Sequence, residues 1–168
     1  MRLRSEDGAP IGELFAHVSG LYFRGKLTYA TRFGRALVIT PDCGLVPAET
    51  TITFDVMKRF ASAEISLDNL RYKQPLEDTA ESLARRSGAT SDFVLLGSVA
   101  SEKYVSILGG IFGSRLRFPS AFVGRGDMSR GGLLLRAAAA GEELEYVPVV
   151  GAVRHGARPP RLAPLPRS

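Results

Sequence analysis

Short, continuous apolar runs alternate with helical patterns along this chain, and this alternation is the feature that most constrains its fold. The runs are rich in β-branched and aliphatic residues, and they comprise "ALVIT" (36–40), "DFVLLGS" (92–98), "RLRF" (115–118) and "ELEYVPVV" (143–150). Strands that are apolar throughout and separated by helices are typical of a parallel sheet buried on both faces. We therefore expect a three-layer α/β fold with a mostly parallel sheet of about four to five strands and helices on both faces.

The segments between these runs carry apolar residues at helical spacing. Residues 11–33 show this spacing, and we expect Gly20 to break it into two helices and Gly34 to end the second one. Further helices are predicted at 55–61, 76–86, 101–113 and 133–141. Residues 51–54 are predicted to be extended, and residues 61–75 to be irregular.

The positive charge of the chain is concentrated at its C-terminus. The 168 residues carry a net charge of +5, and the segment 151–168 contains four arginines and no acidic residue. The remaining body is therefore nearly neutral, at +1. We predict one α/β domain over 1–150, which is an ordinary domain size, and a Pro/Arg-rich extended tail over 151–168.

Three features favour a cytoplasmic protein. The single cysteine, Cys43, cannot form an internal disulfide. The start of the chain, "MRLRSEDGAPIGELF", lacks the apolar core of a signal peptide. No apolar run approaches the roughly 20 residues that span a bilayer, so we expect no membrane partner. A homo-oligomer is compatible with the sequence, which sets no assembly state.

Residues 122–134, "FVGRGDMSRGGLL", form the candidate anion site. In open α/β sheets, ligands bind beyond the carboxyl ends of strands, and this stretch follows a predicted strand end. Glycines allow close backbone approach, a helix N-terminus offers free amides, and arginines bind phosphate in a bidentate manner. The predicted phosphate-binding residues here are Gly124, Arg125, Gly126, Ser129 and Arg130.

The same stretch has a structural alternative. It matches neither the phosphate-loop pattern nor the dinucleotide pattern G-x-G-x-x-G. It is equally compatible with a turn and a helix cap, in which Gly131 and Gly132 permit close helix packing.

Two other segments contribute predicted ligand contacts. In "LYFRGKL" (21–27), Tyr22, Arg24 and Lys26 interleave aromatic and basic groups that can stack on a base and hold a phosphate. An amphipathic helix with a solvated basic face explains the same pattern. In "LLGSVASEKY" (95–104), Ser98 and Lys103 flank a small-residue turn that can bind an anion, and a plain cap and turn is the alternative.

Catalytic groups are sparse. Asp127 is the candidate general base, and Cys43 or Ser98 would be the nucleophile of a hydrolase. The two histidines, His17 and His155, have no spacing that pairs them with Cys43. We therefore predict no metal site and no cofactor, and no reaction is assigned.

The order of motifs resembles a group of small bacterial α/β domains. That group carries a "LY-x-G-x-L-x-x-x-A" helix, a strand, and a "GL-x-x-P-x-x-x-I-x-x-[YF]-D" segment. The matching positions here are Leu21, Tyr22, Gly25, Leu27, Ala30, Gly44, Leu45, Pro47, Ile52, Phe54 and Asp55, followed by Lys103 and Tyr104. Such domains resemble those found near 7-deazaguanine DNA-modification enzymes and, more distantly, the peroxide-stress DNA-protection proteins of the YaaA type. The resemblance implies a link to nucleotides or nucleic acid.

These observations together predict a domain that binds a phosphate-bearing ligand, a nucleotide or DNA, in DNA or nucleobase metabolism. The alternative is a non-catalytic interaction module. In that case "RPPRLAPLPR" (158–167) would form a polyproline helix that docks on an aromatic groove of a partner.

Overall fold

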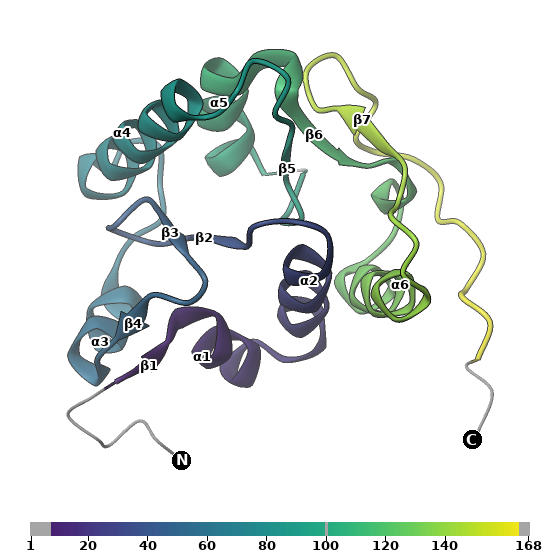
Figure 1. Ribbon diagram of the computed structural model, residues 1–168, viewed down its shortest axis with the longest axis horizontal. Helices are drawn as coiled ribbons and strands as arrows, with labels where there is room; N and C mark the ends of the chain where they lie inside the picture. Colours follow the sequence, from purple (N-terminus) through teal and green to yellow (C-terminus); the bar gives the residue numbers. More distant parts are fainter. Residues whose placement is uncertain (1–7, 100, 165–168) are drawn as a thin grey trace.

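The computed structural model describes residues 8–99 and 101–164, and it shows helices arranged around small sheets (Figure 1). Residues 1–7, 100 and 165–168 lie outside the described residues, and with them the last residues of the predicted tail, including Arg167. The helices are α1 (Ile11–Val18), α2 (Gly20–Phe33), α3 (Phe54–Ser62), α4 (Leu70–Arg86), α5 (Glu102–Phe112) and α6 (Asp127–Ala140), with short 3-10 helices η2 (Gly113–Arg115) and η3 (Ser120–Phe122). The strands are β1 (Ala9–Pro10), β2 (Leu37–Ile39), β3 (Leu45–Pro47), β4 (Thr51–Ile52), β5 (Phe93–Val94), β6 (Leu116–Pro119) and β7 (Tyr146–Pro148).

The predicted three-layer parallel sheet is wrong. Within the described residues the strands form three separate sheets, β1–β4, β2–β3 and β5–β6–β7. Only β5 and β6 pair in parallel, with α5 in the connection between them, and β7 pairs antiparallel to β6. The strands are too short and too dispersed to build one sheet covered on both faces.

The turn after β2 explains much of this difference. After β2 the chain reverses at 41–44, and β3 pairs antiparallel with β2 instead of a later strand joining it in parallel. The Thr40 hydroxyl donates to the Gly44 carbonyl and accepts from the Cys43 amide, which closes the turn. Gly44 has φ +67° and lies against the Pro75 carbonyl of α4, so no other residue fits there without strain.

Most predicted helices are confirmed. The chain breaks at Ser19 between α1 and α2, and the Gly34 amide donates to the Ala30 carbonyl at the end of α2. Residues 61–75 were predicted to be irregular, which is wrong for their second half, because α4 begins at Leu70 with an Asn69 cap and contains Pro75. Proline usually ends a helix, so its presence concealed the start of α4.

Two clusters of buried apolar side chains hold the fold together. The larger cluster joins α2, α4, α5 and α6 to the β5–β6–β7 sheet. The smaller cluster joins α1, β2, β4 and α3. In Figure 1, α2 lies between the region of the small cluster and α6, so it contributes to both halves of the molecule.

The described part of the predicted tail, residues 151–164, has no helix or strand and runs along the outside of α6 in Figure 1. Among the residues that the structure describes, no helix is both long and apolar enough to cross a membrane.

Candidate functional site

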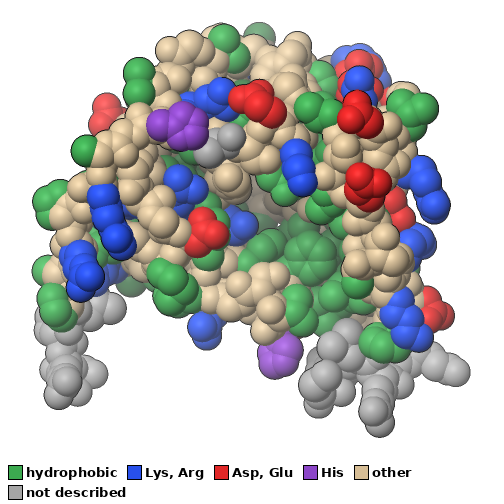
Figure 2. All heavy atoms as spheres, turned by 180° about the vertical axis from the view of Figure 1, so that it is seen from behind, with side chains coloured by type: hydrophobic (Ala, Val, Ile, Leu, Met, Phe, Trp, Pro, Cys, Tyr) green, Lys and Arg blue, Asp and Glu red, His purple; other side chains and the backbone are tan. Residues whose placement is uncertain are grey.

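A cavity of about 720 Å³ lies where the two apolar clusters meet. Its walls come mainly from α1, α2, β2, β3, α3, β5 and α5, with single residues from α4, β6 and α6, and most of the side chains that line it are aliphatic or aromatic. Figure 2 shows the molecule hollowed at its centre, with hydrophobic side chains on the walls. Ligand sites in proteins are typically concave and apolar, with a few placed polar groups, and this cavity has the volume of such a site.

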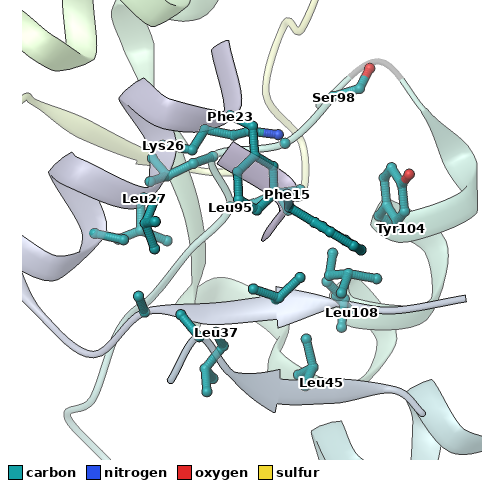
Figure 3. Close-up of a pocket in the computed structure, with 18 of the residues that line it drawn as sticks. Phe15, Phe23, Lys26, Leu27, Leu37, Leu45, Leu95, Ser98, Tyr104 and Leu108 are labelled. Atoms are coloured by element: carbon teal, nitrogen blue, oxygen red, sulfur yellow. The ribbon is translucent and has the colours of Figure 1, made fainter. Parts of the chain in front are cut away.

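The polar groups of the cavity are few. In Figure 3, Lys26, Ser98 and Tyr104 lie on one side of the cavity, and Leu37 and Leu45 lie on the opposite side. Within the described residues, the Lys26 ammonium, the Ser98 hydroxyl and the Tyr104 hydroxyl form no hydrogen bond or ion pair. One side of the cavity therefore has three polar groups that are free to bind a ligand, and the charged side chains of Arg35, Asp92 and Asp127 also line the cavity.

Among the described residues, two cations line the cavity, namely Lys26, which is half-buried, and Arg35, which is exposed. Lys26 lies on the inner face of α2, and its ammonium lies 4.4 Å from the ring centroid of Tyr22 and 5.0 Å from that of Phe23. Aromatic faces attract a cation but do not neutralise it. Burial lowers the pKa of Lys26, and the charge of Asp127, which lines the same cavity, acts in the opposite direction.

Tyr22 fixes α2 against β5. Its hydroxyl donates to the Leu96 carbonyl at 2.7 Å, just after β5. Burial raises the pKa of Tyr22, and Arg130 opposes this shift. The phenol is therefore a neutral donor that anchors the cavity wall.

The residues of the predicted anion site at 122–134 do not all lie at the same place in the structure. Asp127 begins α6 and lines the cavity together with Tyr22 and Lys26, as expected for one shared site. Neither Arg125 nor Arg130 lines that cavity. Arg125 donates to the Ala121 carbonyl, the Ser129 hydroxyl and the Pro160 carbonyl, so it bonds its own loop and the tail.

Arg130 is almost fully buried, at 8% exposure. Its guanidinium donates twice to the Phe122 carbonyl and lies over the Phe122 ring. Its nearest carboxylate is that of Asp127, at 4.0 Å. These contacts give Arg130 a clear structural role, which is to hold η3 against α6.

The glycines of the stretch serve different purposes. Gly124 has φ +72°, and a Cβ placed there would lie 2.1 Å from the Ala157 carbonyl oxygen of the tail. Gly126 is the N-cap of α6, and a Cβ there would meet nothing within 4 Å. Gly131 packs against the backbone of α2 at Tyr22, which supports the close-packing alternative for this glycine.

The other predicted residues lie apart from the cavity or have structural partners. Arg24 and Lys103 are exposed and do not line it, whereas Ser98 does. Cys43 donates to Asp42, which also pairs with Arg59. Burial and then Asp42 raise the pKa of the Cys43 thiol, which disfavours the nucleophilic thiolate.

The cavity itself was missed by sequence reasoning, and so was the role of Tyr104. Tyr104 and Leu108 are four residues apart on α5 and both line the cavity, which is a helical spacing that the sequence contains but does not distinguish from core packing. Among the residues that the structure describes, no three His, Cys, Asp or Glu side chains gather as metal ligands would.

Comparison of the chain with protein-family models, with curated proteins and with solved structures finds no match.

Proposed function

We propose that the central cavity binds a small organic molecule that has an apolar body and one anionic group, such as a phosphate monoester. The observation that supports this most is the position of Lys26, an unpaired and half-buried ammonium on the wall of a mostly apolar cavity. A cation in such surroundings is poorly solvated, and an anionic ligand restores the interaction that it lacks.

This proposal keeps the phosphate-bearing ligand that the sequence predicts and changes the residues that hold it. Lys26, Ser98 and Tyr104 replace the two arginines as the groups nearest the ligand, because Arg125 and Arg130 are bonded to backbone carbonyls. Asp127 lies at the same cavity, and its negative charge favours a ligand with few negative charges over a polyphosphate.

Calorimetric titration with 1-naphthyl phosphate tests the proposal, since this compound pairs a flat apolar body with one phosphate. We expect binding to the unaltered chain and at least tenfold weaker binding to Lys26→Met, because a hydrogen bond to a charged group contributes about 1.5–3 kcal/mol. Lys103→Met is the matched control, since Lys103 is exposed on α5 and does not line the cavity. The proposal fails if millimolar 1-naphthyl phosphate does not bind, or if both variants bind it equally well.

A further inference from the structure

The cavity is bordered by two strands that each have one unpaired edge. β2 pairs only with β3, and β5 pairs only with β6, among the described residues. A strand edge without a neighbour presents a row of backbone N–H and C=O groups that need partners. The backbone groups of these edges therefore add hydrogen-bond donors and acceptors to the side chains that line the cavity.

The register identifies which backbone groups of β2 are free. Val38 is opposite Val46, the Thr40 amide donates to the Gly44 carbonyl, and the Ala48 amide donates to the Ala36 carbonyl. In an antiparallel pair, alternate residues exchange hydrogen bonds and those between them point away from the partner. The N–H and C=O groups of Leu37 and Ile39 therefore point away from β3, and they have no hydrogen-bond partner in the described chain.

The cavity follows these edges. Successive residues of a strand point to opposite faces, so a cavity that touches one face meets every second residue. Here all three residues of β2 line the cavity, and so does every residue from 92 to 98 around β5. A cavity that meets consecutive residues of both strands passes along their edges.

The two strand edges differ in the backbone donors and acceptors that remain free. Just after β5, the Tyr22 hydroxyl already donates to the Leu96 carbonyl. On β2, Leu37 and Ile39 each keep a donor and an acceptor side by side. The β2 edge is therefore the more complete hydrogen-bonding surface of the cavity.

We infer that the body of the ligand is a planar nitrogen heteroaromatic ring with a donor and an acceptor on one edge, of the nucleobase type, and that the open edge of β2 binds it. This inference rests on the proposed function, which supplies the anionic group. Nucleobases carry adjacent donors and acceptors on their edges, which match the N–H and C=O pair of one strand residue. The rings of Phe15 and Phe23, in edge-to-face contact at 5.4 Å, line the same cavity and provide aromatic surface against a flat ring.

An alkyl chain fits the same cavity less well. It would expel water from the β2 edge and leave the Leu37 and Ile39 backbone groups without partners, which weakens binding. An extended peptide would pair with the edge, but the cavity volume of about 720 Å³ suits a small molecule, and the half-buried Lys26 provides an anchoring charge for it.

The test compares two probes on three forms of the full chain. The probes are a panel of nucleoside 5′-monophosphates and 1-naphthyl phosphate, which has the same anionic group on a ring without nitrogen. The forms are the unaltered chain, Leu37→Pro and Leu37→Ala. Proline removes only an outward-facing N–H at the first residue of β2, a position where strands tolerate it, and alanine is the control that keeps this donor.

We expect at least one nucleotide to bind more tightly than 1-naphthyl phosphate. Relative to Leu37→Ala, Leu37→Pro should bind that nucleotide roughly three- to tenfold more weakly, the effect of one hydrogen bond, and should bind 1-naphthyl phosphate equally well. If Leu37→Pro does not fold, amide hydrogen exchange in the unaltered chain decides. The nucleotide should then protect the Leu37 and Ile39 amides, and 1-naphthyl phosphate should not.

The outcomes separate this inference from the proposed function. If 1-naphthyl phosphate or octyl phosphate binds and every nucleotide binds more weakly, the inference is overturned and the proposed function stands. The inference is also overturned if Leu37→Pro weakens both probes equally, or if an extended peptide binds in preference to nucleotides. If no phosphate binds, both proposals fail together.

Discussion

The two faces of α2 show opposite ways of packing one helix. On the face toward α6, a Cβ placed at Gly25 would lie 2.7 Å from the Gly131 carbonyl oxygen, so the two helix backbones are in direct contact. On the other face, Lys26, Leu27 and Ala30 border a cavity of about 720 Å³. The helix α2 therefore has a backbone-to-backbone contact with α6 on one face and borders a cavity on the other.

This difference indicates that the cavity is not a consequence of poor packing in general. Protein interiors are close-packed, and voids larger than a water molecule are few. A chain that places glycine at both Gly25 and Gly131 brings two helices into backbone contact, at a cost of about 1 kcal/mol per glycine in helix propensity. The helices α2 and α6 thus pack tightly against each other, although α2 also borders the cavity.

The largest expected effect comes from disturbing the closely packed face. Gly25→Val should lower the free energy of unfolding by about 3 kcal/mol, because its Cβ meets the Gly131 backbone, which cannot move as a flexible side chain would. Urea denaturation measures this change. Gly110→Ala is the matched control, since a Cβ there meets nothing within 4 Å, and it should raise stability by about 0.5–1 kcal/mol. Equal effects at Gly25 and Gly110 would contradict the difference between the faces.

The opposite sign is expected five residues further along the same helix. Ala30→Leu adds three carbons toward the cavity, and their burial should outweigh the side-chain entropy lost, for a net gain of about 1 kcal/mol. The same denaturation experiment measures it, and 1-naphthyl phosphate should bind more weakly to this variant. A loss of stability similar to that of Gly25→Val would show that the cavity side is packed as closely as the α6 side.

The sequence predicted the helices well and their assembly poorly, for a physical reason. Helix ends such as those at Gly34 and Gly113 depend on local conformation, so they can be inferred from nearby residues. The partner of β2 depends on whether the chain reverses at 41–44, and the place where this turn packs involves Pro75, a residue far along the chain whose carbonyl lies against Gly44. An apolar run indicates a strand but not its partner.

The residues of the candidate site show the same difference between what local patterns predict and what depends on distant parts of the chain. Tyr22, Lys26, Ser98 and Asp127 were predicted from local patterns, and the structure places all four on one cavity. Arg125 and Arg130 were predicted from the same kind of pattern, but their partners are the Phe122, Ala121 and Pro160 carbonyls. A basic residue beside glycines has the same sequence signature whether it faces a ligand or a carbonyl of its own chain.

The smallest expected effect concerns the charge of Lys26. It is a pH dependence of stability that arises on the cavity face of α2. Burial lowers the pKa of Lys26 in the folded chain, so between that value and the ordinary pKa of 10.5 the unfolded chain holds a proton that the folded chain has released. Stability rises with pH wherever the unfolded state binds more protons, so this lysine should make the folded chain relatively more stable as pH rises through that interval. Lys26→Met removes the contribution, and the difference in unfolding free energy between the two chains should therefore change as pH rises towards 10.5.

The control for this measurement is Lys103→Met, which removes a lysine that is exposed on α5 and does not line the cavity. The effect is modest because Lys26 remains in contact with a cavity that admits water, and nearby Asp127 partly offsets the burial.

A bound phosphate monoester should favour the charged lysine and raise the pKa of Lys26. The affinity for the phosphate monoester should therefore fall as pH rises through the pKa of Lys26. Lys26→Arg should abolish that fall, since a guanidinium stays protonated throughout. If the affinity of the unaltered chain does not change with pH while that of Lys26→Met is lower, then Lys26 acts by filling space beside Tyr22 and Phe23 and not by its charge.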